Sequence, residues 1–434
     1  MVSSADRYGD TIVLPWLQAV IELLATCVRT GRRRDARCVG YNRTSLFMQR
    51  KRSQISTICT SLNMNRVCSS CFADEDLRAW IRKEGGPRGC SACNRFDSPT
   101  AKFYKVAKHI EECIGRYYGR AVDQLMYCSA EGGYLGAHWD SWDMLEKIGL
   151  MLPRDDGTLY SSIAQAMADE IWCDFDAGAL DLDDALRTSW QGFCETVKHK
   201  RRFFFHATGR DDQDSLTPAS LLDHIAGVSQ NIGLIKEISA GTAFWRARVD
   251  LPKGKGAGAS DFGPPPVEHA LQSNRMNPAG IPMLYLASTI ATALKETRKE
   301  AAKVGLWRAT RPLRVLDLRA LPPEPGMFSD AGRTTKLTLS FLHDFAADIM
   351  QPVDRDQRVH VDYLPSQVVT EFVRDYQFEG GVVDGIAYAS TVDRRGWNIA
   401  LFLGPTQLGL AEPEWGHRQP PSLTFERAMW ATRP

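Results

Sequence analysis

The sequence predicts an α+β protein in which a four-cysteine segment and a helical region precede a mixed α+β domain. Four of the cysteines occur as two short pairs between residues 68 and 93. Apolar residues then recur at three- and four-residue steps up to about residue 233, which indicates helices. From about residue 236, Pro and Gly separate short apolar runs, a pattern typical of strands and helices joined by loops. A chain of 434 residues has room for all three parts.

Composition excludes several classes of protein. The formal net charge is +1, so there is no global reason to expect a nucleic-acid or membrane partner. All 11 cysteines lie in the first 194 residues, which argues against a secreted disulfide scaffold. We therefore expect a cytoplasmic protein with one special cysteine cluster.

Residues 1–63 differ from the rest of the chain. They contain ten Lys and Arg residues against four Asp and Glu residues. Their apolar run, residues 11–28, is too short and too polar for a membrane span. Because Met64 lies just before the first recognisable motif, we hypothesise that translation begins there and that residues 1–63 are an extension that is not native.

The cysteine pairs indicate a metal site in residues 64–99. Cys68-x-x-Cys71 and Cys90-x-x-Cys93 are separated by 18 residues, which matches the spacing of a zinc ribbon. Four thiolates close the coordination sphere, so we expect structural Zn²⁺ that folds the segment and does no chemistry. The alternative is four free thiols. Basic and acidic residues occur in similar numbers around the two cysteine pairs. We therefore expect the segment to pack within the protein or contact a partner rather than bind nucleic acid.

Residues 100–235 are predicted to form a helical domain. An apolar stripe that includes Phe103, Val106, Ile110, Ile114 and Tyr117 marks its first helix. Further helices are predicted at residues 142–151, 161–172, 184–197 and 218–230, the last with Thr217 as its N-cap.

Arg201, Arg202 and His206 suggest an alternative function. If this segment is helical, Arg202 and His206 share a face, and a His can act there as general acid or base on RNA. The competing interpretation is a packing element, because three consecutive Phe residues, 203–205, precede the His. Both interpretations stay open at this point.

The mixed domain is predicted for residues 236–404. Strands are expected at residues 243–249, 283–287, 313–318, 381–389 and 398–403, and helices at residues 292–304, 335–350 and 365–374. Residues 251–266 are expected to form a loop, and residues 405–434 an irregular C-terminal tail.

The stretch from Arg275 to Glu296 is the main candidate for a site in this domain. A loop around Pro278, a buried strand and the start of a helix would hold a cation, Tyr285 and a carboxylate. Such a unit can bind an anionic ligand, because the Arg guanidinium can donate two hydrogen bonds to one phosphate and a carboxylate stabilises developing positive charge. The same residues also fit an ordinary strand-helix connection.

Other polar residues could complete such a site. Arg246 and Arg248 alternate on a predicted strand and so project from one side of it. If Arg246 converges with Arg275, the two guanidinium groups can clamp a pyrophosphate; otherwise they belong to a solvated edge strand. Ser390 and Asn398 flank later strands and are candidate hydrogen-bonding groups at a pocket rim.

Four ordered motifs resemble those of the RES domain, a family named for its Arg, Glu and Ser. They are Trp245-Arg246; Arg275-x-Asn277-Pro278-x-Gly280-x-Pro282-x-Leu284-Tyr285; Ala293-Leu294-x-Glu296; and Asp384-Gly385-Ile386-x-Tyr388-x-Ser390. The resemblance spans about residues 236–404. The four-cysteine segment and residues 131–134 and 197–199 also resemble the HEPN/RES N-terminal domain that is often fused to it. Many RES domains have Gly before and Trp after the second Arg, where this chain has Asn274 and Met276.

RES domains resemble the ADP-ribosyltransferase toxins of bacterial toxin-antitoxin systems, which bind NAD. The resemblance implies that Arg246 and Arg275 hold the phosphates, Tyr285 packs the nicotinamide end and Glu296 is the catalytic carboxylate. The implied catalytic set is Glu296, Arg246 and Ser390, and the implied NAD-binding set is Arg246, Arg275, Asn277, Tyr285 and Asn398.

The resemblance therefore implies a toxin-like enzyme that cleaves the nicotinamide-ribose bond of NAD by hydrolysis, phosphorolysis or ADP-ribosyl transfer. The expected partners are NAD, an antitoxin protein and a protein acceptor of ADP-ribose. One alternative is an RNA-binding or RNA-cleaving HEPN and zinc protein. Another is a non-catalytic RES scaffold that only binds partners.

Overall fold

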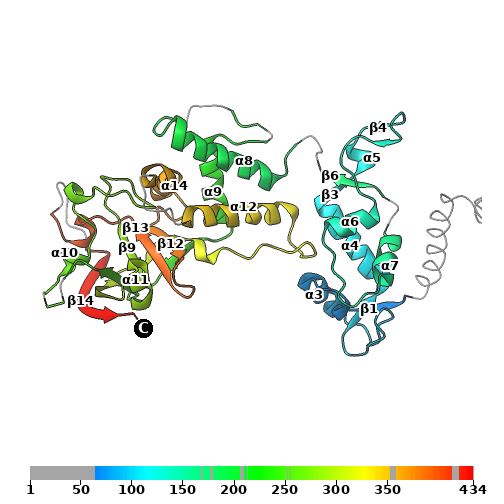
Figure 1. Ribbon diagram of the computed structural model, residues 1–434, viewed down its shortest axis with the longest axis horizontal. Coiled ribbons are helices and arrows are strands. Elements are labelled where there is room, and N and C mark those ends of the chain that lie inside the picture. The colour runs from blue at the N-terminus through cyan, green and yellow to red at the C-terminus, as the bar shows by residue number, and fades with distance from the viewer. Residues whose placement is uncertain are drawn as a thin grey trace, which may run out of the picture. The chain divides into compact units, whose positions relative to one another are not determined.

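The computed structural model describes residues 64–167, 170–175, 179–205, 210–212, 214–251, 253–254, 256–351, 358–412 and 420–433 (Figure 1). The chain from Asn63 to Pro434 forms one compact unit. The hypothesis about residues 1–63 falls outside the described residues. Within those residues, no helix combines the length and the apolar character that a membrane span requires.

The four-cysteine segment folds around a short antiparallel pair of strands. β1 (Arg66–Cys68) pairs with β2 (Thr100–Lys102), and between them lie the 3-10 turn η1 (Ser69–Cys71) and helix α3 (Glu75–Glu84). Asp74 caps α3 by accepting the Leu77 N–H, and Gly85 ends it with a φ of 61°, where Gly is favoured.

The predicted helical region begins with α4 (Phe103–Tyr117), whose apolar stripe is buried as expected. Short helices then alternate with short strands: β3 (Tyr118–Arg120), α5 (Ala121–Gln124), β4 (Tyr127–Cys128), β5 (Gly133–Tyr134), α6 (Ser141–Lys147), α7 (Thr158–Ala166) and β6 (Trp172–Asp174). The helix predicted at residues 161–172 is wrong at its end, because Trp172 pairs with Arg120 between β6 and β3. The buried faces of α4, α6 and α7 share one core with the four-cysteine segment.

The next helical elements belong to a different core. α8 (Leu182–Glu195) continues into the π-helix η2 (Thr196–Lys200), and α9 (Pro218–Asn231) starts after Thr217, whose hydroxyl accepts the Ser220 N–H. Their buried faces pack with α12 (Arg333–Met350), α14 (Leu364–Asp375) and one face of a large sheet. A single hydrophobic core therefore extends across residue 235, where a domain boundary is predicted.

Among the described residues, eight strands form one sheet in the order β14-β10-β8-β9-β13-β12-β11-β7. The strands are β7 (Ile235–Ile238), β8 (Ala243–Arg248), β9 (Leu284–Ala287), β10 (Ala301–Ala309), β11 (Leu313–Asp317), β12 (Gly385–Ala389), β13 (Trp397–Leu401) and β14 (Leu423–Thr432). β11 and β12 run parallel, and the other pairs are antiparallel. β8 and β9 meet at a single pair, Trp245 with Ala287.

The two faces of this sheet bury different cores. Leu284, Leu286 and Ile399 face a core that also contains Phe262 of the short helix α10 (Ala259–Phe262). The alternate positions, among them Tyr388 and Ala400, face α8, α9, α12 and α14. Short elements connect these layers: η3 (Val267–His269), α11 (Ile290–Thr297), η4 (Leu318–Ala320), α13 (Val359–Asp362) and η5 (Thr406–Leu408).

Two elements differ from the prediction. The helix expected at residues 292–304 stops at Thr297, where Arg298 takes the left-handed conformation with a φ of 57°, and the chain continues as β10. Pairing with β8 on one side and β14 on the other outweighs the helix propensity of the Ala and Lys residues in β10. The tail expected to be irregular contains β14, which pairs along the whole of β10.

Candidate active site and metal centre

A pocket of about 600 Å³ lies on the helix-covered face of the sheet, beside β9, β12 and β13. Its volume is within the range of about 300 to 1,000 Å³ that is typical of ligand pockets. Residues 271–275 of the loop before β9 form one wall, and residues 359, 360 and 363 of the α13 region form another. Tyr285, Tyr388 and Asn398 line it from the strands, and Glu296 lines it from α11.

Glu296 is held through one of its two carboxylate oxygens. Its Oε1 accepts from Ser390 Oγ at 2.8 Å and from Asn398 Nδ2 at 2.6 Å. The N–H groups of Val392 and Asp393 donate to Ser390 Oγ at 3.3 and 3.2 Å, so the hydroxyl proton of Ser390 is directed to Glu296. No described residue donates to Oε2 of Glu296. One oxygen is therefore fixed and the other can bind a ligand.

The turn that carries Ser390 is tied to the helix that carries Glu296. Asp393 accepts from Lys295 Nζ at 2.8 Å and from Thr292 Oγ1 at 2.7 Å, both on α11. The hydrogen bond from Lys295, followed by that from Thr292, lowers the pKa of Asp393. These contacts fix the position of the Ser390 turn relative to Glu296.

The loop that contains Arg275 is braced from inside by Tyr285. The Tyr285 hydroxyl donates to Asn277 Oδ1 at 2.6 Å and accepts from the Met276 N–H at 3.2 Å. Asn277 Nδ2 donates to the Ile281 carbonyl at 2.8 Å. The Met276 side chain, where many RES domains have Trp, is fully buried in the helix-covered core.

Helix α14 holds the same loop from outside. Ser366 Oγ donates to the Arg275 carbonyl at 2.6 Å. Gln367 Nε2 donates to the carbonyls of Asn274 and Asn277 at 2.8 and 3.2 Å. The backbone that presents Arg275 is thus fixed by side chains about 90 positions later in the chain.

The Arg275 guanidinium has no carboxylate partner among the described residues. Its Cζ lies 5.8 Å from the centre of the Tyr388 ring, which is a cation-π arrangement. A cation that is partly removed from water and lacks a counter-charge favours an anionic ligand.

Arg246 lies behind this pocket and is not part of its lining. By strand alternation it shares a face with Phe244, whereas Trp245 pairs with Ala287 on the pocket face. Its guanidinium donates to the Gly263 carbonyl at 2.7 Å. Burial, with the neighbouring Arg248 charge, lowers the pKa of Arg246 to about 9, so the group remains charged at neutral pH.

The predicted site residues therefore fall into two groups. The pocket brings together Arg275, Tyr285, Glu296 and Asn398, and Ser390 bonds to Glu296 behind them. Arg246 and Asn277 support neighbouring backbone instead. The charges of Arg275 and Arg246 both act on Tyr285 and oppose the rise in its pKa that burial causes.

Comparison with protein-family models finds two matches in this chain. The RES domain model matches residues 243–424, a range that includes every pocket residue named above. The model of HEPN/RES N-terminal domain 1 matches residues 83–211. The chain carries both domains. No curated protein and no solved structure matches it. A RES domain is consistent with a function that involves NAD.

Some residues that line the pocket or support its wall could not be predicted from their types alone. Ser366 and Gln367 are buried although both are polar, because they face the Arg275 loop. Tyr388 belongs to the fourth motif, but nothing in the sequence indicates that it lines the pocket. Tyr363 also lines it, and it follows α13, which no periodicity predicts.

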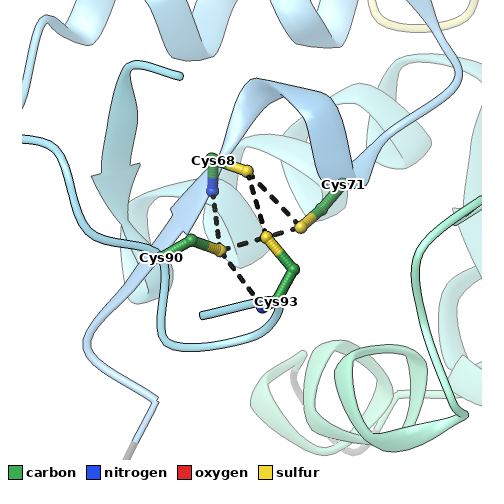
Figure 2. Close-up of side chains that lie close together, drawn as sticks. All are labelled: Cys68, Cys71, Cys90 and Cys93. Atoms are coloured by element: carbon green, nitrogen blue, oxygen red, sulfur yellow. Dashed lines mark hydrogen bonds between the residues drawn. The ribbon is translucent and has the colours of Figure 1, made fainter. Parts of the chain in front are cut away.

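The four cysteines form the second candidate site (Figure 2). Their Sγ atoms all lie within 4.8 Å of one another, with Cys68 3.6 Å from both Cys71 and Cys93, and Cys71 3.7 Å from Cys90. Four thiolates about 2.3 Å from one tetrahedral ion would be separated by about 3.8 Å. All four are free cysteines. The donor set and its spacing fit a metal ion.

Hydrogen bonds within the cluster favour a thiolate at Cys90. The Cys71 thiol donates to it, and the N–H groups of Cys68 and Cys93 lie 3.3 and 3.5 Å from its Sγ. The pKa of Cys90 is lowered to about 4, chiefly by the bond from Cys71. The same bond raises the pKa of Cys71, and burial raises the pKa of Cys68 to about 11. A bound cation would favour the thiolate at all four.

The helix considered for Arg202 and His206 is wrong, because Arg202 does not lie in a helix. The π-helix η2 ends at Lys200, so Arg201 and Arg202 lie beyond it and a four-residue spacing no longer implies a shared face. His206 lies outside the described residues. Phe203 and Phe204 are exposed, at 82% and 86%, whereas Phe205 packs in the core.

Proposed function

We propose that the RES domain binds NAD in this pocket and breaks the bond between nicotinamide and ribose. The arrangement around Glu296 carries the proposal. Ser390 and Asn398 fix one carboxylate oxygen, and the other receives no hydrogen bond from a described residue. A carboxylate held in this way is suited to act on a ligand rather than to stabilise the fold.

The proposed chemistry needs such a carboxylate. When the bond breaks, its electron pair leaves with nicotinamide, and positive charge develops on the ribose. A carboxylate that accepts a ribose hydroxyl proton in a hydrogen bond stabilises this charge more in the transition state than in the ground state. Water, inorganic phosphate or a protein side chain then takes the ADP-ribose, giving hydrolysis, phosphorolysis or transfer.

The cations support a ligand that carries phosphate. Arg275 in the pocket and Arg246 behind it form no ion pair with a carboxylate of the described residues. Arg248 has Asp250 and Asp261 nearby without a direct ion pair. Arg246 Nη1 and Arg248 Nε donate instead to carbonyls of the α10 segment, Gly263 and Asp261. We propose that Arg275 binds the phosphates directly and that Arg246 contributes its charge. In this proposal a protein antitoxin would restrain the activity.

The test is the Glu296→Gln variant. Purified protein is incubated with NAD, with and without inorganic phosphate and a protein extract, and NAD, nicotinamide and ADP-ribose products are measured by chromatography. Glu296→Gln should lower the rate by about 10² to 10³, the usual effect of losing one electrostatic contact to the transition state. Glu300→Gln makes the same change at an exposed residue outside the pocket lining and should keep the rate. An unchanged rate of NAD consumption in Glu296→Gln would contradict the proposal.

We also propose that Cys68, Cys71, Cys90 and Cys93 hold a structural zinc ion. Thiolate ligands with this spacing favour Zn²⁺ over the hard cations that prefer oxygen. With four protein ligands no position is left for water, so the ion would hold the segment together without taking part in the reaction.

A further inference from the structure

Tyr388 is the most deeply buried aromatic residue of the pocket, with 7% of its surface exposed. It lies on β12 directly opposite Asn398, the residue that donates to Glu296. Its hydroxyl neither donates to nor accepts from any described residue. The ring is buried, but the hydroxyl is on the pocket side and is open to a ligand there.

The two charged groups of the pocket both act on Tyr388. The Arg275 Cζ lies 5.8 Å from its ring centre. Burial raises the pKa of Tyr388 to about 12, and the Glu296 charge adds to this rise while Arg275 opposes it. The phenol is therefore neutral near pH 7 and can donate a proton in a hydrogen bond.

The other tyrosine on this face is already engaged. The Tyr285 hydroxyl donates to Asn277 and accepts from the Met276 N–H, so its role is to brace the loop. Glu296 Oε1 is likewise occupied by Ser390 and Asn398. The Tyr388 hydroxyl is thus a neutral donor next to an unpaired cation. The acceptor that suits both groups is an anionic oxygen.

We propose that Tyr388 donates a hydrogen bond to the same ligand phosphate that Arg275 holds. Tyr388 is then a binding residue that favours phosphate-bearing nicotinamide nucleotides. This inference rests on the proposed function, because it needs NAD to occupy the pocket.

The experiment measures NAD affinity in the Glu296→Gln background, in which NAD should be consumed about 10² to 10³ times more slowly during the titration. Calorimetry gives Kd for this protein and for the protein that also carries Tyr388→Phe. The added substitution removes one oxygen and keeps the ring, so the melting temperature should not change. Kd should rise about 10- to 100-fold, as expected for a hydrogen bond to a charged group. Tyr376→Phe makes the same change outside the pocket lining and should leave Kd unchanged.

A double-mutant cycle with Arg275→Ala identifies the shared phosphate. If both side chains hold one phosphate, Tyr388→Phe should have a clearly smaller effect once Arg275 is gone. Additive effects would show that Tyr388 binds elsewhere and would overturn the inference, as would an unchanged Kd in Tyr388→Phe alone. Failure of the unsubstituted protein to bind and consume NAD would instead overturn the proposed function.

Discussion

The four-cysteine cluster and the pocket of the RES domain differ in how far apart their side chains lie in the sequence and in whether those side chains contact one another. The cluster draws its cysteines from one short stretch, Cys68 to Cys93, and its sulfur atoms contact one another. The pocket draws on elements from Arg275 to Asn398, and it leaves the Arg275 guanidinium, the Tyr388 hydroxyl and one oxygen of Glu296 without a hydrogen-bond partner among the described residues.

The difference favours a structural role for the cluster and a ligand-binding role for the pocket. A closed set of donors can hold an ion and fold its surroundings, but it offers nothing to a substrate. A pocket whose polar groups lack hydrogen-bond partners can offer those groups to a ligand. The two sites also lie in different cores: the cluster packs with α4, α6 and α7, and the pocket with α8, α9, α12 and α14.

Removal of the metal should have the largest effect and should be confined to the first site. Structural zinc contributes about 10 to 16 kcal/mol to the folding of small zinc-binding peptides. Chelation, or Cys90→Ser, should therefore unfold the segment around α3 and abolish hydrogen-exchange protection there. NAD consumption should persist, because the pocket belongs to the other core.

Elemental analysis should show one zinc ion per chain in the native protein and none after chelation. Cys128→Ser is the matched control, since Cys128 is half-buried and outside the cluster. Protection of α3 that survives complete loss of the metal would contradict a structural role. Loss of NAD consumption together with the metal would contradict the independence of the two sites.

Gln367→Met should have a smaller effect, confined to ligand binding at the second site. The substitution keeps the length of the side chain but removes the donor to Asn274 and Asn277. The Asn277 carbonyl keeps the Asn274 N–H at 2.9 Å, whereas the Asn274 carbonyl loses its side-chain donor. The loss of one hydrogen bond costs about 0.5 to 1.5 kcal/mol, so the loop should loosen and KM for NAD should rise up to about tenfold. Because Glu296 is held separately, kcat should change little.

Steady-state kinetics separate these two constants. Gln377→Met places the same side chain at an exposed position outside the pocket lining and is the control. A fall in kcat at constant KM would show that Gln367 acts on the chemical step and not on the Arg275 loop.

The two sites also differ in how far the sequence predicts them. The cysteine ligands are close in sequence, so their spacing alone predicts the cluster. The contact of Ser390 and Asn398 with Glu296 crosses about 100 positions, and no local pattern encodes it. The ends of the predicted strands offer both residues as candidates and the family resemblance adds weight to Ser390, and the structure brings them together.

The secondary structure, burial and side-chain direction of some residues depend on tertiary contacts that cannot be predicted from the local sequence. Residues 301–304 have helical propensity, yet they form β10 because strands pair with them on both sides. Gln367 looks like a surface residue of an amphipathic helix, but it is 4% exposed because the Arg275 loop lies over it. Arg246 matches its motif, yet strand alternation directs it away from the pocket face.

The smallest predicted effect concerns a link between the two matched domains. Lys198 of η2, within the HEPN/RES N-terminal domain, pairs with Asp362 of α13 at 3.4 Å, and α13 contributes residues 359 and 360 to the pocket wall. Ion pairs that keep access to water contribute about 0.2 to 1 kcal/mol, and both side chains of this pair are partly exposed, so Lys198→Ala should raise Kd for NAD by less than about fivefold. Lys200→Ala, at an exposed neighbour, should leave it unchanged. In a double-mutant cycle, Asp362→Ala should abolish the effect of Lys198→Ala. A full effect of Lys198→Ala in the absence of Asp362 would mean that the N-terminal domain acts on the pocket through the shared hydrophobic core and not through this ion pair.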